Sequence, residues 1–194
     1  MVQTPTKPLT LEEFLQQPET KPASEFIDGQ IIQKHIAQGK HSTLQVDLGA
    51  DINLRLKPQH IARAYSELRC TFGGRSIVPD IAVFTWERIP RDDNGKVSNT
   101  LARAALAEGI APDWTIEILS PDQSQTKVVR NILHCLTHGT QMGWLIDPEE
   151  EVVFAYFADR TLAVFELASD RLPVLPFAES FNLTVGKLFS WLKE

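Results

Sequence analysis

The sequence predicts one α/β domain in which a mixed β-sheet is flanked by α-helices. Helical and strand-like hydrophobic periods alternate through the centre of the chain, and hairpin signals lie toward both ends. Of the 194 residues, 43% are apolar and 23% are charged, which is ordinary for a single globular unit. We therefore expect residues 1–194 to form one domain, with a flexible tail over residues 1–8.

The first expected elements are a short helix and a hairpin. Thr10 and Glu13 have the spacing of a capping box, in which each side chain accepts a backbone N–H at the start of a helix. A helix is therefore expected over about 10–17. Asp28-Gly29 separates two apolar runs and is a strong hairpin signal, because a type I′ turn needs positive φ at both central residues.

The next segments predict a long helix and a second hairpin. Apolar residues recur every four positions over about 41–56, which is the spacing of an amphipathic helix, and Pro58 ends it. Residues 61–70 alternate loosely and residues 77–84 form a short apolar run, so both are expected to be strands. Gly73-Gly74 lies between them and predicts the turn of a hairpin.

The second half of the chain alternates between strands and helices. Residues 86–112 are rich in turn-forming residues and predict a loop with a short helix, the most mobile part of the chain. The elements expected after it are a strand at 114–119, a helix at 122–138, a strand at 143–146, a hairpin of 152–157 and 161–165, and a helix at 183–192.

Charge and composition narrow the function classes. The net charge of −6 argues against general nucleic-acid binding, because attraction to phosphate dominates such affinity. Residues 34–75 nevertheless hold seven basic and three acidic residues, which fits either a metal-dependent nuclease or a solvated surface. No apolar run approaches the ~20 residues of a membrane span. The N-terminus has no secretory signal, and Cys70 and Cys135 form no CxxC motif, so a cytoplasmic setting is expected.

Two carboxylates stand out because apolar residues surround them. Asp80 lies within Ile77–Phe84, and Glu117 lies within Trp114–Leu119. A carboxylate inside a buried strand is costly to desolvate unless it is paired or binds a cation. Two such strands side by side would bring both carboxylates to one divalent ion, and hard oxygen ligands suit Mg²⁺. The alternative is that each acid pairs with an arginine or lies on an exposed face.

Six stretches together resemble the restriction-endonuclease-like family of PD-(D/E)XK proteins, a large bacterial group. They are Glu25-Phe-Ile-Asp-Gly29, His41-Ser42, Glu67-Leu-Arg69, Val78-Pro-Asp-Ile-Ala-Val83, Glu117-Ile-Leu-Ser-Pro121 and Gly143-Trp-Leu-Ile-Asp-Pro148. The resemblance covers the chain from about Leu9 to Leu192. It implies the restriction-endonuclease-like fold, a mixed β-sheet flanked by α-helices.

The resemblance also implies a site and a reaction. Asp80 and Glu117 take the metal-binding positions, and the backbone carbonyl of Ile118 is a further oxygen ligand. Glu25 approaches the same ion from the N-terminal segment. The implied activity is Mg²⁺- or Mn²⁺-dependent hydrolysis of DNA phosphodiester bonds by water. A homodimer is expected, because cutting two strands favours two sites and symmetric dimers are common.

The chain departs from the family pattern at the lysine. The superfamily lysine follows the second acid by two residues, where this chain has Leu119. The relocated Lys-x-x-x-Tyr pattern falls on Asn131 and Cys135. Lys127, one helical turn before Asn131, is our candidate to orient the attacking water, and the alternative is an exposed helix lysine. These departures leave open a non-catalytic binding or assembly protein that kept the fold.

Four basic residues are candidates for contacts with the DNA backbone, namely Lys40, His41, Arg69 and Arg75. His41 could bind phosphate or relay a proton, or it could simply cap the helix at 41–56. The others could equally be solvated surface charges. Hydrolysis of a small phosphorylated metabolite is a third possibility, and it predicts a closed pocket in place of an open groove.

Overall fold

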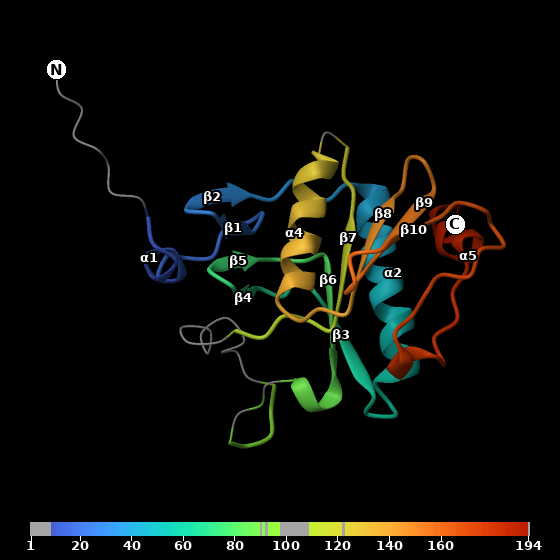
Figure 1. Ribbon diagram of the computed structural model, residues 1–194, viewed down its shortest axis with the longest axis horizontal. Coiled ribbons are helices and arrows are strands. Elements are labelled where there is room, and N and C mark those ends of the chain that lie inside the picture. The colour runs from blue at the N-terminus through green and yellow to red at the C-terminus, as the bar shows by residue number, and fades with distance from the viewer. Residues whose placement is uncertain (1–8, 90, 92, 98–108, 122, 194) are drawn as a thin grey trace.

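The computed structural model describes residues 9–89, 91, 93–97, 109–121 and 123–193, which form two β-sheets with helices packed against them (Figure 1). The α-helices of this part of the chain are α1 (Leu11–Leu15), α2 (Gly39–Leu56), α4 (Gln125–Thr137) and α5 (Val185–Ser190). The strands before the central loop are β1 (Ser24–Ile27), β2 (Gln30–Gln33), β3 (Ala62–Ser66), β4 (Cys70–Phe72), β5 (Arg75–Ile77) and β6 (Ile81–Thr85). The strands after it are β7 (Trp114–Ile118), β8 (Met142–Asp147), β9 (Val152–Phe157) and β10 (Leu162–Phe165).

The large sheet has the strand order β10-β9-β8-β7-β6-β3 and is mixed, as the sequence predicts. β7 and β8 run parallel, whereas the other neighbours are antiparallel. Parallel neighbours need a crossover connection, and α4 supplies it between β7 and β8. This crossover packs α4 against the strand that carries Glu117.

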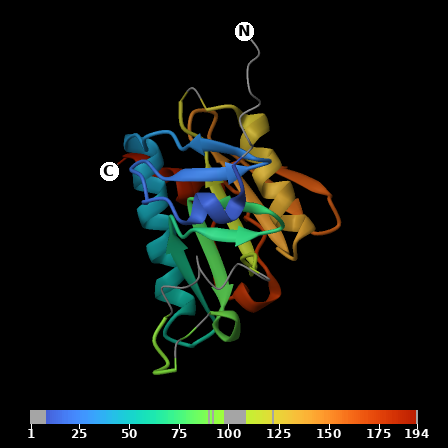
Figure 2. The same cartoon turned by 90° about the vertical axis from the view of Figure 1, so that its left-hand side faces the viewer.

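The two faces of the large sheet differ in chemistry. Trp114, Ile116 and Ile118 of β7 pack with Leu48 of α2 in the main apolar core, which α5 also joins. Side chains alternate along a strand, so Glu117 points to the opposite face, where α4 packs. Figure 2 shows α2 and α4 on the two sides of the sheet. The apolar residues on one face of β7 therefore position an acid on the other face.

The second hairpin is divided between the two sheets, which corrects the simple hairpin expected from 61–70 and 77–84. β3 and β6 pair in the large sheet, whereas β4 and β5 pair across Gly73-Gly74 in a small sheet of order β2-β1-β5-β4. The physical reason is a break in the extended chain at Glu67, whose φ of 50° turns the chain out of the large sheet. The small sheet brings Glu25 on β1 to the region of the molecule where Asp80 and Glu117 lie.

The other expected elements are confirmed with small shifts of their ends. The capping box at Thr10 and Glu13 is present, with both expected hydrogen bonds. The predicted loop at 86–112 begins with a 3₁₀ turn at Trp86–Arg88, and its residues 98–108 lie outside the described residues, as does the predicted tail at 1–8. No helix within the described ranges is long and apolar enough to cross a membrane.

Candidate active site

Three acidic side chains meet where the small sheet lies beside β6 and β7. Ile81 of β6 pairs with Ile116 of β7, so Asp80 and Glu117, the next residues in this register, lie opposite each other and point to the same face. Glu25 joins them from β1. The three acids are only 3–6% exposed, so they need neutralising partners. The structure thus brings together the three acids that the sequence singles out.

Asp80 is held by three donors. Its Oδ1 accepts a hydrogen bond from Nζ of Lys34 at 2.7 Å, and its Oδ2 accepts the backbone N–H of Ile118 at 2.8 Å. Nε2 of His41 lies 3.0 Å from the same Oδ2. Nδ1 of His41 is buried and has no hydrogen-bond partner among the described residues, so we place the imidazole proton on Nε2, which donates to Asp80.

Lys34 is a cation inside the acidic cluster that no sequence pattern singled out. It follows β2 directly, and its side chain is only 12% exposed. Besides Asp80, its Nζ donates to the carbonyl of Val78 at 2.6 Å. The contact with Asp80 joins residues 46 positions apart, and nothing in the local sequence around Lys34 indicates such a partner. Its only sequence signal is membership of the basic stretch at 34–75.

Glu25 links the acidic cluster to helix α4. Its Oε1 accepts the backbone N–H of Val78 at 2.8 Å, and its Oε2 lies 3.4 Å from Nδ2 of Asn131. Asn131 stands where the family pattern has a lysine, so an amide here contacts the acid. Cys135, at the tyrosine position, is buried in an apolar cluster with Cys70. Both cysteines are therefore packing residues.

Burial and the neighbouring charges set the protonation of the acids. Burial raises the pKa of Glu117 well above its ordinary value, and the negative charge of Asp80 raises it further. Burial also raises the pKa of Glu25. Burial acts in the same direction on Asp80, but the ammonium of Lys34 and the hydrogen bond from His41 outweigh it and hold the pKa of Asp80 below its usual range. The cluster therefore contains one ion pair, Asp80 with Lys34. Beside it lie two carboxyl groups, Glu25 and Glu117, whose ionised forms an additional cation would stabilise.

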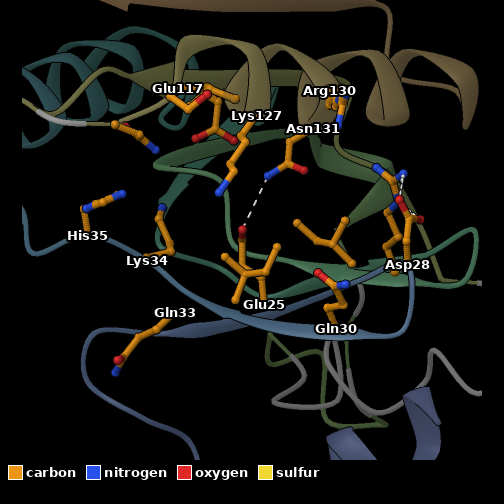
Figure 3. Close-up of a pocket in the computed structure, with 16 residues that line it drawn as sticks. Glu25, Asp28, Gln30, Gln33, Lys34, His35, Glu117, Lys127, Arg130 and Asn131 are labelled. Atoms are coloured by element: carbon orange, nitrogen blue, oxygen red, sulfur yellow. Dashed lines mark hydrogen bonds and ion pairs between the residues drawn. The ribbon is translucent and has the colours of Figure 1, made fainter. Parts of the chain in front are cut away.

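A cavity of about 530 Å³ opens beside Glu117, between the β1–β2 hairpin and α4 (Figure 3). This volume is in the range of ligand-binding clefts. Lys34 and Lys127 line the cavity from opposite walls. Lys127 comes from the first turn of α4, is exposed, and forms no ion pair with the residues that the structure describes. The lysine predicted from sequence thus shares a cavity with Glu117 and Glu25.

The oxygen ligands suit a hard divalent cation that keeps part of its water shell. Mg²⁺ is usually bound through one or two carboxylates and retains several waters. Asp80, Glu117 and the carbonyl of Ile118 supply oxygens of this kind, and an added cation would favour the ionised form of Glu117. Over the described ranges, no three His, Cys, Asp or Glu side chains are grouped so that they could hold a metal ion by themselves. A divalent ion at this place would therefore need water molecules for part of its coordination.

The four candidates for DNA-backbone contacts take different places. Arg75 lines the cavity and pairs with Asp28 through two hydrogen bonds. Lys40 is exposed and pairs with a glutamate after β8. Arg69 is 9% exposed and bound to a glutamate of the N-terminal segment, so it has no free group for a phosphate. His41 is buried against Asp80 and neither caps α2 nor reaches the surface. Arg69 and His41 are therefore removed from the candidate DNA contacts.

Comparison with known proteins identifies the family. The model of the Uma2 family, described as "Putative restriction endonuclease", matches residues 11–186. A crystal structure described as "a putative nuclease belonging to DUF820" from Anabaena variabilis ATCC 29413 superposes with a TM-score of 0.89. It is 58% identical in sequence, and the match covers 95% of this chain and 99% of that chain. No curated protein matches. The family model spans most of the chain and confirms the resemblance seen in its motifs, so the chain belongs to the Uma2 family.

Proposed function

We propose that the protein is a divalent-metal-dependent endonuclease that hydrolyses DNA phosphodiester bonds at the cluster of Asp80 and Glu117. The observation that carries the proposal is the convergence of these two buried acids with Glu25 beside a cavity that basic side chains line. The descriptions of the family and of the similar crystal structure support the class of reaction.

The acidic cluster would hold Mg²⁺ or Mn²⁺. Asp80 and Glu117 would supply carboxylate oxygens and Ile118 its carbonyl, with Glu25 as a further negative charge close by. A bound ion of this kind lowers the pKa of water and stabilises the charge that develops on the phosphate. The protein's part is to fix the acids before the substrate arrives, which the donors to Asp80 and Glu25 do.

Basic side chains of the cavity would bind the substrate. Lys127 would orient the attacking water and contact the phosphate, because it reaches into the cavity and has no ion pair to break among the described residues. Arg130, on the same helix, and Arg75, from the small sheet, also line the cavity. These cations give a local attraction for a DNA backbone, although the whole chain carries a net charge of −6.

Cleavage of supercoiled plasmid DNA with Mg²⁺ or Mn²⁺ tests this proposal. We expect nicked and linear products from the wild type, and loss of activity in EDTA. Asp80→Ala and Glu117→Ala should cleave at least about a hundredfold more slowly, the usual effect of removing one transition-state-stabilising group. Asp51→Asn removes an acid of α2 that does not line the cavity and should cleave at the wild-type rate. Equal activity in all four proteins would remove the nuclease assignment from this site.

A non-catalytic binding or assembly role is the second candidate, because Asn131 and Cys135 stand where the family pattern has lysine and tyrosine. Calorimetry with Mn²⁺ distinguishes the two. Micromolar to millimolar binding that is lost in Asp80→Ala supports the enzyme, whereas no binding at all favours the second role. Sedimentation measurements test the proposed homodimer separately.

A further inference from the structure

We propose that Lys34 is a tethered cation that holds the metal-binding oxygen of Asp80 until a divalent ion displaces it into the cavity. This inference rests on the proposed function, because it concerns how that site accepts its ion. It assigns a positioning role to a lysine that lies outside the family's lysine positions and yet at the centre of the acids.

The two oxygens of Asp80 are not equivalent. Oδ2 accepts from the backbone N–H of Ile118 at 2.8 Å and from Nε2 of His41 at 3.0 Å. A carboxylate has about four lone-pair sites on its two oxygens, so Oδ2 has none left for a metal. Oδ1 has a single donor among the described residues, Nζ of Lys34 at 2.7 Å. A divalent ion that uses Asp80 must therefore approach Oδ1.

The ammonium of Lys34 occupies the place that such an ion would take. It interacts with the charges of Asp80, Glu117 and Glu25 at the same time. Two cations on one carboxylate oxygen would lie within a few ångströms of each other, where like charges repel strongly even in a partly hydrated site. Binding of the ion should therefore weaken the Lys34–Asp80 ion pair and favour displacement of the ammonium.

Lys34 is the donor to Asp80 that can leave. Ile118 is fixed in β7 and His41 in α2, whereas Lys34 follows β2 in a segment without regular structure and lines the cavity. Leaving breaks two hydrogen bonds, to Asp80 and to the carbonyl of Val78. The long side chain can then turn into the space that faces Lys127 in Figure 3. There the ammonium would donate to phosphate oxygens of the substrate.

Amine labelling of the wild-type chain follows this displacement. Reductive dimethylation with formaldehyde and cyanoborohydride modifies accessible lysines, and peptide mass spectrometry measures each one. Without a divalent ion, Lys34 should react more slowly than Lys127, which is exposed in the same cavity. Saturating Mn²⁺ should raise the ratio of Lys34 to Lys127 modification severalfold. An unchanged ratio, at Mn²⁺ concentrations where calorimetry shows binding, would overturn this inference and leave the proposed function standing.

Calorimetry with Mn²⁺ gives an independent test through the sign of the affinity change. Lys34→Met removes the competing cation and should bind Mn²⁺ at least about fivefold more tightly, the lower end of coupling between linked sites. Lys57→Met removes an exposed lysine outside the cavity and should keep the wild-type affinity. Weaker binding by folded Lys34→Met would mean that Lys34 assists the metal and would overturn the inference. If the wild type binds no Mn²⁺, the proposed function fails and the inference fails with it.

Discussion

The two walls of the cavity hold their charges in different ways. On the sheet wall, Lys34 is nearly buried and bonded to Asp80, which lies behind the wall and is also contacted by the buried His41. On the helix wall, Lys127 and Arg130 are exposed and form no ion pair within the described residues. Buried charges are tolerated only when they are paired, whereas exposed charges cost little. The sheet wall should therefore govern stability and ion binding together, while the helix wall can contact a substrate without affecting the fold.

Among the changes to the sheet wall, removal of Asp80 should reduce the stability of the protein most. Asp80→Ala leaves Lys34 buried without its charged partner, and breaking a buried pair from one side typically costs about 3–5 kcal/mol. Urea unfolding in EDTA measures this loss. Asp51→Asn breaks a more exposed pair with Arg55 on α2 and should cost no more than about 0.5 kcal/mol. Equal losses in the two variants would contradict the distinction between buried and exposed pairs.

Because of Glu117, the free energy of unfolding of the protein should fall as the pH rises. Burial and the charge of Asp80 raise the pKa of Glu117, so the folded chain binds this proton more tightly than the unfolded chain does. The resulting stability is complete below pH 4.5, the ordinary pKa, and is lost as the pH rises through the folded-state pKa. We expect Glu117→Gln to flatten this decline in urea unfolding with EDTA. The same slope in both proteins would assign the decline to other groups.

The contact between α4 and the small sheet should contribute stability that is lost as the pH falls, which is the opposite of the effect of Glu117. His134 of α4 stacks on Phe72, with ring centroids 5.0 Å apart. Burial lowers the pKa of His134 to about 4, so the stability that the neutral ring contributes is complete above pH 6.5 and is lost as the pH falls toward 4. His134→Gln should reduce this loss, measured by thermal unfolding across that range. The same pH dependence in His134→Gln as in the wild type would contradict the assignment of this loss to His134.

Changes on the helix wall should have the smallest effect on stability. Lys127→Met and Arg130→Met should unfold at the wild-type temperature. Each should weaken DNA binding at low salt and reduce the slope of log K against log salt by about one. Fluorescence anisotropy with labelled DNA in EDTA measures binding without cleavage. Lys57→Met, at the exposed end of α2 and outside the cavity, is the matched control. A loss in the control equal to that of the cavity variants would show that DNA does not use the helix wall.

Most of the fold could be predicted because its signals are local. The capping box at Thr10, the turn at Asp28-Gly29 and the alternation in Trp114–Leu119 depend on residues within a few positions of each other. The assignment of β4 and β5 to a second sheet could not be predicted in this way. Gly73-Gly74 specifies a turn, but the sheet that its strands join depends on β1, which is distant in the sequence.

The residues of the candidate site divide in the same way, into those that the local sequence reveals and those that only the fold reveals. Asp80 and Glu117 are visible in the sequence, because an acid inside an apolar strand breaks a local pattern. Lys34 is invisible there, because a lysine after a short strand is ordinary until the fold brings it to Asp80. Arg69 was expected at the surface for a similar reason, since its burial depends on a partner far away in the sequence.

Anomalous diffraction from a crystal soaked in Mn²⁺ would test most directly whether Asp80 and Glu117 share a divalent cation. We predict a single Mn²⁺ about 2.0–2.6 Å from Oδ1 of Asp80 and from an oxygen of Glu117. The amino group of Lys34 should then lie in the cavity, away from Asp80. A saturating soak that leaves no anomalous peak between the two acids, with Lys34 still bound to Oδ1, would contradict the proposed site.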